Sequence, residues 1–111
     1  VALRVAVNGV PVTAVSAAPP AFALGPAVPN PAAGTTAIEF ALPVAGPVDL
    51  SIFDIAGRRV SRLAGGIQAA GIHHARWSRR DAQGRLVNPG VYYYRLAADG
   101  RVAARRLVVL R

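Results

Sequence analysis

Short runs of alternating apolar and polar residues, separated by glycine and proline, make up most of this chain from residue 36 onward. In the first run, the side chains that share one side of an extended chain are Thr36, Ile38, Phe40 and Leu42. A period of two residues is that of a strand with one buried face. No segment shows the apolar period of about 3.6 residues that an amphipathic helix requires. The chain is therefore expected to fold as an all-β domain.

Six strands are expected in this part of the chain, each bounded by a turn or a loop. They fall at residues 36–42, 48–55, 60–63, 72–77, 91–98 and 101–110. Residues 65–71 and 78–90 are expected to be loops, and Asp99-Gly100 is typical of a type I′ hairpin turn. Strands at such short intervals indicate a β-sandwich or a barrel, and a length of 111 residues favours a sandwich of two antiparallel sheets. The large side chains expected in its core are Ile38, Phe40, Leu42, Leu50, Ile52, Trp77, Tyr92, Leu96 and Leu107.

The N-terminal third of the chain has a different character. Residues 1–7 alternate like a half-buried strand, and Asn8-Gly9 then predicts a turn. The apolar side of this strand consists of Val1, Leu3, Val5 and Val7. The following residues are rich in proline, which lacks a backbone donor, so we interpret them as an extended linker. The predicted organisation is an extended arm at residues 1–12, a linker at residues 13–34 and a sandwich at residues 35–111.

Two interpretations of the arm are open. It is either the last strand of a preceding domain or an edge strand of the sandwich, or it is a donor strand that pairs with a neighbouring copy of the chain. Head-to-tail exchange of the second kind does not close, so it would build a filament. The chain begins with Val1 rather than Met and shows no signal peptide, so we interpret it as a processed product, a secreted mature form or a piece of a longer chain.

Composition excludes some classes of protein and leaves others open. Thirteen basic residues, all arginine, against five acidic residues give a net charge of +8. The absence of cysteine excludes disulfides and thiolate metal sites, and no apolar run of ~20 residues is present to span a membrane. The arginines beside Tyr92, Tyr93 and Tyr94 leave single-stranded nucleic acid as a weak alternative partner. An anionic surface polymer is a stronger one, and such attraction should weaken with salt.

Candidate catalytic and metal-binding residues are few and scattered. His73 and His74 are adjacent strand residues that point to opposite faces, so they do not chelate one metal together. Glu39 and Asp49 could meet across a hairpin as a glycosidase-like pair, but we expect each to bond a neighbouring arginine instead. Asp81 and Asn88 are too few ligands for a calcium loop. Ser51, Ser61 and Ser78 lack histidine and aspartate partners at motif spacing. We therefore predict no catalytic residue, no metal site and no cofactor.

The densest motif lies between the fourth and fifth expected strands and is interpreted as an ordered structural loop. Trp77 can bury its ring while its indole N–H bonds a loop carbonyl. Asp81 can accept backbone N–H groups of residues 83 and 84, and Gly84 can then adopt positive φ. Val87 is expected to pack back onto the core, and Gly90 to restart a strand where a side chain would clash. The predicted structural loop residues are Trp77, Asp81, Gly84, Val87, Gly90 and Tyr92.

The spacing W-x3-D-x2-G-x2-V-x2-G-x-Y, from Trp77 to Tyr92, resembles that of the FlgD-like immunoglobulin-like domain family of the flagellar hook-capping protein. It is also similar to the C-terminal sorting domains of proteins exported by the bacterial type IX secretion system. Further matches are Pro29-Asn30-Pro31, residues 35–43, residues 53–60, Ala70-Gly71 and residues 105–111. Arg79 departs from the glycine that is common at its position in the family. The resemblance covers residues 29–111.

The resemblance implies an immunoglobulin-like (fibronectin III-like) antiparallel β-sandwich of six or seven strands without enzymatic activity. It also implies a bacterial extracellular or cell-surface module that acts in sorting, surface anchoring or assembly of a secreted protein. Its partners would be proteins: export machinery, a preceding domain or identical subunits. The candidate sorting or partner strand is Arg105, Arg106, Leu107, Val108, Val109, Leu110 and Arg111. A filament subunit joined through Val1, Leu3, Val5 and Val7 is the alternative, and a nucleic-acid or anionic-polymer binding module is a weaker one.

Overall fold

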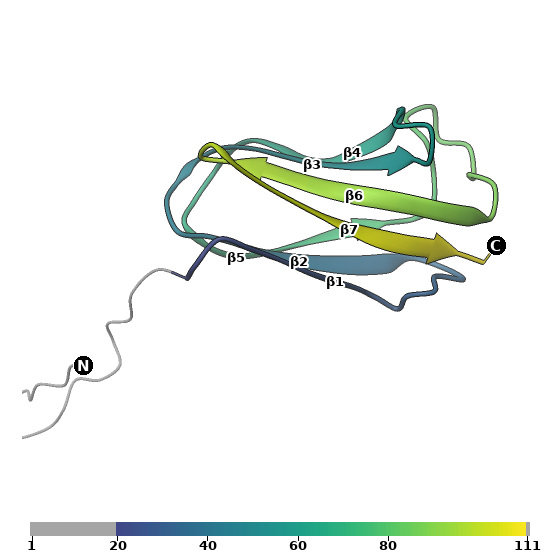
Figure 1. Ribbon diagram of the computed structural model, residues 1–111, viewed down its shortest axis with the longest axis horizontal. Coiled ribbons are helices and arrows are strands. Elements are labelled where there is room, and N and C mark those ends of the chain that lie inside the picture. The colour runs from purple at the N-terminus through teal and green to yellow at the C-terminus, as the bar shows by residue number, and fades with distance from the viewer. Residues whose placement is uncertain (1–19, 111) are drawn as a thin grey trace, which may run out of the picture.

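The computed structural model describes residues 20–110, and in that range the chain forms seven strands and no helix (Figure 1). The strands are β1 (Ala23–Val28), β2 (Thr36–Leu42), β3 (Gly46–Asp54), β4 (Arg59–Gln68), β5 (Gly71–Trp77), β6 (Gly90–Ala98) and β7 (Arg101–Val109). The predicted arm at residues 1–12, with its candidate inter-subunit strand, lies outside the described residues. Within the described part of the chain, no helix could serve as a membrane span.

The strands form two antiparallel sheets that pack face to face. One sheet has the order β1-β2-β5, and the other has the order β4-β3-β6-β7. β2 pairs with β5 along its whole length, from Thr36 opposite Trp77 to Leu42 opposite Gly71. Because β4 lies beside β3 rather than beside β5, the arrangement is that of a fibronectin III-like sandwich. The predicted fold class, an immunoglobulin-like sandwich of six or seven strands, is confirmed.

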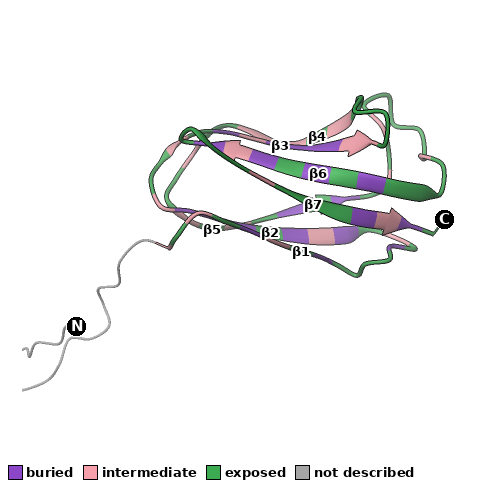
Figure 2. Cartoon of the chain, viewed as in Figure 1, coloured by how far each residue is buried: buried purple, intermediate pink, exposed green. Residues whose placement is uncertain are grey.

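The core lies between the two sheets and is built from alternate residues of the strands (Figure 2). All nine large side chains expected in the core are buried, and Ile38, Leu50 and Leu96 have no exposed surface. Tyr94 is equally buried, and its hydroxyl donates a hydrogen bond to the Gly25 carbonyl at 2.8 Å. This hydrogen bond joins β6 of one sheet to β1 of the other.

The proline-rich segment is not simply a linker, because residues 23–28 form β1 at the edge of the sandwich. β1 pairs with β2, and the register shifts between Leu24 and Ala27, where Gly25 and Pro26 are located. An edge strand tolerates proline at such an irregularity because the missing N–H need not serve a second neighbour. The sandwich therefore begins before residue 35, and Leu24 and Ala27 belong to its core.

Two smaller expectations are also corrected. β4 continues through Gly65 and Gly66 to Gln68, so the loop expected at residues 65–71 is confined to the end of this range. Ile55, the last residue of the strand expected at residues 48–55, lies beyond β3, which ends at Asp54, and is 76% exposed. The hairpin between β6 and β7 agrees with expectation, since both of its central residues have the positive φ that a type I′ turn needs.

The chain enters and leaves the sandwich at opposite ends (Figure 1). Ala23, at the start of β1, lies opposite Ala41, close to the β2–β3 turn. Val109, at the end of β7, lies opposite Gly90, close to the β5–β6 loop. The β3–β4 turn is located at this second end as well, because Asp54 pairs with Tyr92 near the start of β6.

Candidate functional site

The loop that connects β5 to β6 is held against the end of the core by two aromatic side chains. Trp77 is 2% exposed, and its indole N–H donates to the Arg80 carbonyl at 2.9 Å, as the sequence predicted. The Tyr92 ring meets the Trp77 ring edge to face, with centroids 5.7 Å apart. The Tyr92 hydroxyl donates to the Asn88 carbonyl at 2.6 Å, which is the tyrosine corner found at this place in immunoglobulin-like folds.

Within that loop, Asp81 organises a tight turn. Its Oδ1 accepts the backbone N–H groups of Gln83 at 2.9 Å and Arg85 at 3.0 Å, so the second donor is residue 85 rather than the expected residue 84. Gly84 has φ of 84° and donates its N–H to the Asp81 carbonyl. The Arg85 Nε lies 3.3 Å from Asp81 Oδ2. The N–H of Arg85, above all, lowers the pKa of the Asp81 carboxyl below its ordinary value, and burial opposes this effect.

The same turn occurs a second time, between β3 and β4. Asp54 Oδ1 accepts the N–H groups of Ala56 and Arg58, both at 2.9 Å, and the Arg58 Nε lies 3.0 Å from Asp54 Oδ2. Gly57 has φ of 85°, and its N–H bonds to the Asp54 carbonyl. The backbone N–H of Arg58, which hydrogen-bonds to Asp54, is the main cause that lowers the pKa of the Asp54 carboxyl. The repeat D-x-x-G-R-x-V was not predicted, although it is visible in the sequence when residues 54–60 are aligned with residues 81–87.

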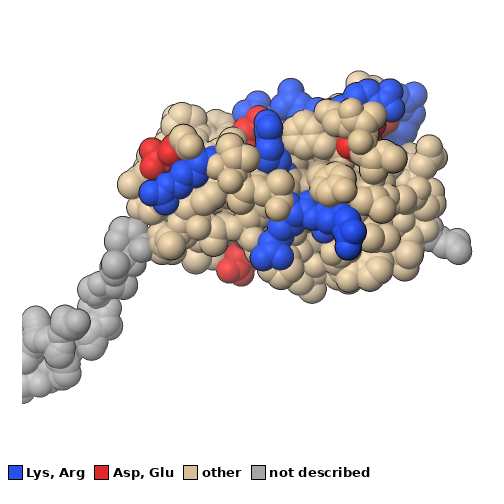
Figure 3. All heavy atoms as spheres, in the orientation of Figure 1, with Lys and Arg blue, Asp and Glu red and all other residues tan. Residues whose placement is uncertain are grey.

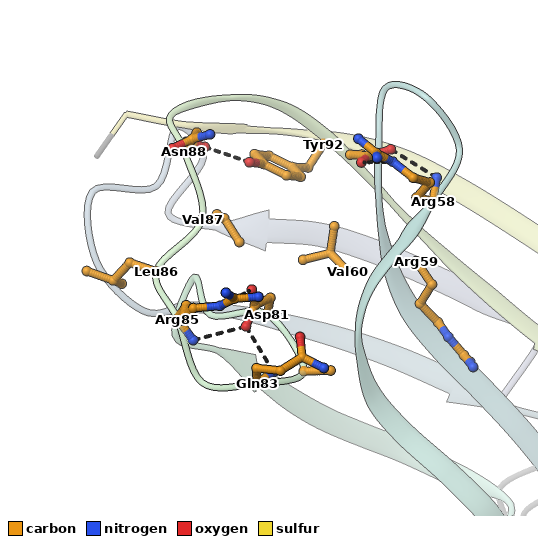
Figure 4. Close-up of a pocket in the computed structure, with 12 residues that line it drawn as sticks. Arg58, Arg59, Val60, Asp81, Gln83, Arg85, Leu86, Val87, Asn88 and Tyr92 are labelled. Carbon is orange, nitrogen blue, oxygen red and sulfur yellow. Dashed lines mark hydrogen bonds and ion pairs between the residues drawn. The ribbon is translucent and has the colours of Figure 1, made fainter.

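The two turns lie side by side and enclose an open groove of about 520 Å³ (Figure 4). The Ala82 N–H donates to the Val60 carbonyl at 3.0 Å, which joins one turn to the other. Val60 and Val87, the last residues of the two repeats, lie between the turns and pack onto the core, as predicted for Val87. Tyr92 also lies in the groove, and burial is the main reason that the pKa of its hydroxyl is raised.

The carboxylates of the groove are already paired within their own turns. Both carboxylates that line it already accept two backbone N–H groups and an arginine Nε, so their oxygens are used in holding the turns. Among residues 20–110, no group of three or more histidine, aspartate or glutamate side chains is positioned to hold a metal ion. Asp81 and Asn88, weighed as calcium ligands, serve instead in the turn and in the tyrosine corner.

Gly90 begins β6 for a different reason from the one expected. A Cβ added to it would meet no atom within 4 Å, so no clash would result. Its φ of 150° is instead a conformation that residues with a side chain rarely adopt. Arg79 stands where glycine is common in the family that the sequence resembles. Its φ of 64° shows that the backbone at this position is left-handed even without glycine.

The acids and histidines weighed for catalysis are dispersed. Glu39 is in β2 and Asp49 is in β3 of the other sheet, so the two carboxylates do not meet across a hairpin. Glu39 Oε1 lies 3.3 Å from His74 Nε2 instead of an arginine. Asp49 is within 3.8 Å of two arginines, Arg59 and Arg62, as expected. His73 lies on the opposite side of β5 from His74 and stacks on Phe40, with ring centroids 5.2 Å apart.

The candidate partner strand forms the second half of β7 and is fastened by the Pro-Asn-Pro motif. The Asn30 amide donates to the Arg106 carbonyl at 3.3 Å and accepts the Val108 N–H at 3.0 Å. Ala32 continues this contact as a parallel bridge to Val109, with backbone hydrogen bonds of 2.7 and 2.8 Å. Within the candidate strand, Leu107 and Val109 are buried, Val108 is half-buried, and Arg105, Arg106 and Leu110 are exposed. Arg111 lies outside the described residues.

Fold and site together define a fibronectin III-like immunoglobulin domain in which Asp54 and Asp81 each organise a tight turn. The sequence model of the FlgD Ig-like domain family matches residues 25–101. The chain belongs to that family, whose members are non-catalytic. The match begins at β1, earlier than the resemblance seen in the sequence.

Solved structures agree with this assignment. FlgD from P. aeruginosa is 28% identical with a TM-score of 0.52, over 67% of this chain and 59% of that one. Two proteins of Porphyromonas gingivalis share the fold alone: PorU, at 17% identity and a TM-score of 0.63, and PorZ, at 22% and 0.50. They are matched over 82% and 81% of this chain but only 10% and 11% of their own lengths. No curated protein matches.

Proposed function

We propose that this chain is a non-catalytic, exported bacterial module that acts in sorting, surface anchoring or assembly of a secreted protein, and that a protein partner recognises the segment Arg105–Arg111. Membership of the FlgD Ig-like family supports the module and its lack of catalysis. PorZ, which shares the fold, is described as a bacterial surface component of a type IX secretion system. The proposal extends that setting to this chain.

The observation that carries the proposal is that the C-terminal segment presents exposed side chains, those of Arg105, Arg106 and Leu110. Residue 20 enters at the end of the sandwich near the β2–β3 turn, and the end of β7 lies at the other end (Figure 1). A domain attached before residue 20 would therefore leave the end of β7 uncovered. The Asn30 side chain and Ala32 hold the segment in the folded sandwich, so a partner would meet it as a fixed surface.

The structure changes how this proposal should be tested. Deletion of residues 107–111 would remove Leu107 and Val109, which are 0% and 1% exposed, and so would damage the core. Lost export after such a deletion would report unfolding as readily as lost recognition. The useful positions are Arg106 and Leu110, which are exposed.

The test compares two double variants of the chain, each fused to a secreted reporter enzyme in a bacterium that exports the parent protein. Arg106→Gln with Leu110→Ser removes one charge and one exposed apolar side chain from the proposed recognition segment. Arg101→Gln with Val102→Ser makes the same two changes at the opposite end of β7, where Val102 is 62% exposed. We expect the first variant to retain reporter in the cell and the second to export it normally. Normal export of both folded variants would overturn the proposal.

No feature of the described residues supports the alternative that this chain is a filament subunit. A donor strand fills a groove that would otherwise expose the core. In residues 20–110 the two sheets already cover the core, as the full burial of Ile38, Leu50 and Leu107 indicates. We therefore do not adopt strand exchange through residues 1–7 as a function.

A further inference from the structure

The outer face of the four-stranded sheet carries an unusual row of side chains. Strand register places Arg59, Phe53, Tyr93 and Arg106 side by side across β4, β3, β6 and β7. These residues face away from the core because their neighbours Ile52, Tyr92 and Leu107 are buried. Since adjacent strands lie about 4.8 Å apart, the row spans about 14 Å from one arginine to the other.

A second row adds two more guanidinium groups to the same face. It consists of Arg62, Ser51 and Arg95, again in direct register across three strands. The Arg95 Cζ lies 5.2 Å from the centroid of the Phe53 ring, a cation–π contact that lays the guanidinium over the aromatic face. A shallow hollow of about 340 Å³ lies here, lined by Phe53, Tyr93 and Arg95 among others.

The face is positively charged because its arginines outnumber its acids. In the described part of the chain, two acids lie at these rows. Asp49 is 3.7 Å from Arg59 and 3.8 Å from Arg62. Asp54 lines the hollow and is paired with Arg58 at 3.0 Å. Within residues 20–110, Arg95 and Arg106 form no ion pair. Figure 3 shows arginine atoms gathered over β7 and along the β3–β4 side of the molecule, with acidic atoms at isolated places.

We propose that this face binds an acidic polysaccharide, with the carboxylates of the polymer on Arg95 and Arg106 and a sugar ring on Tyr93. The planar guanidinium of arginine matches a carboxylate with two parallel hydrogen bonds. Tyr93 is 42% exposed and offers an aromatic surface between these arginines. A flat, charged face of this kind suits an extended polymer that makes many weak contacts along its length.

Two other classes of macromolecule fit the face less well. Single-stranded nucleic acid needs several open aromatic rings for successive bases, but Arg95 covers Phe53 and leaves Tyr93 as the open ring of the row. A protein partner usually anchors a side chain in a deep pocket or adds a strand to a free edge. The strand that carries Tyr93 and Arg95, β6, is an inner strand without a free edge, and the hollow beside it is shallow.

The test measures binding of polygalacturonate, a polymer of uronic acid, to the purified chain, with neutral dextran and a single-stranded DNA oligonucleotide as comparison ligands. At about 0.15 M salt we expect binding to polygalacturonate, no binding to dextran and weaker binding to DNA. Arg95→Gln should weaken polygalacturonate binding about tenfold, and Tyr93→Thr should weaken it severalfold. Arg95→Lys keeps the positive charge but lacks the planar guanidinium, so it should give an intermediate loss of affinity.

Arg76→Gln is the matched control, because Arg76 is exposed in β5 of the other sheet and carries the same charge. It should change the affinity less than twofold. Equal losses for Arg76→Gln and Arg95→Gln would overturn the site in favour of attraction by net charge, and tighter binding of DNA would assign the face to nucleic acid. Failure to bind polygalacturonate would also overturn it.

Because Arg95 lies outside the C-terminal segment, Arg95→Gln should leave export unchanged, so the two proposals fail separately.

Discussion

Replacement of Asn30 by alanine should loosen the C-terminal strand with little change elsewhere. The substitution removes two hydrogen bonds, one to the Arg106 carbonyl at 3.3 Å and one from the Val108 N–H at 3.0 Å. A neutral hydrogen bond contributes about 0.5–1.5 kcal/mol net, and at exposed positions such as these water replaces the lost partner. We therefore expect the free energy that holds this part of β7 in place to fall by about 1 kcal/mol.

Amide hydrogen exchange at Val108 is the most direct measurement of this effect. A loss of about 1 kcal/mol corresponds to roughly fivefold faster exchange when the amide opens locally. Asn88→Ala is the matched control, since Asn88 is exposed and accepts the Tyr92 hydroxyl with its backbone carbonyl and not with its side chain. It should leave Val108 exchange unchanged.

Asn30→Asp tests the direction of the two hydrogen bonds. A carboxylate can still accept the Val108 N–H, but it has no donor for the Arg106 carbonyl and repels it. The protection of the Val108 amide, taken relative to its intrinsic exchange rate at the same pH, should therefore be lower than in the unaltered protein at neutral pH. It should recover once the carboxyl is protonated. If Asn30→Ala left Val108 exchange as slow as Asn88→Ala does, the Pro-Asn-Pro motif would not be what fastens β7.

Leu50→Ala, at a position in the middle of β3 with no exposed surface, should lower the free energy of unfolding by about 3–5 kcal/mol in urea denaturation. A loss under about 1 kcal/mol would contradict close packing at this point. Gly57→Ala and Gly84→Ala should each cost about 1–2 kcal/mol in the same assay, because both glycines have φ near 85° while an added Cβ meets no atom. Clearly unequal costs would show that the two turns are not equivalent. The lowered pKa values of Asp54 and Asp81 mean that the stability they contribute is present above the ordinary carboxyl value of 3.8 and is lost as pH falls below it. In thermal melts from about pH 6 to about pH 2, Asp54→Asn with Asp81→Asn should flatten the acid-induced fall of Tm, and an unchanged slope would refute this assignment.

The strands and the core follow from local sequence, because a strand buries every second side chain whichever strand lies beside it. Ile38, Leu50 and Leu96 could be assigned to the core without knowing the sheet order. β1 could not be recognised in this way. Its Gly25-Pro26 is typical of a linker, and it is compatible with a strand only because β1 lies at an edge and shifts register there.

The candidate site likewise combines features that are encoded locally with features that depend on strand order. Each D-x-x-G-R-x-V turn is encoded locally, since an aspartate, a glycine with positive φ and an arginine interact within five residues of one another. The groove between them is not local. It exists because β3 and β6 are antiparallel neighbours, which brings the β3–β4 turn and the β5–β6 loop to one end of the sandwich.

Sequence alone determined that this protein is all-β with an ordered Trp77-to-Tyr92 loop, because strand periodicity and turn chemistry act between residues that are close in the chain. Tertiary structure alone decided that Asn30 fastens Val108, that two separate turns share one groove, and that Arg59, Phe53, Tyr93 and Arg106 form one row. Each of these depends on strand order and register. Those are set by how the two sheets pack, which no single segment specifies.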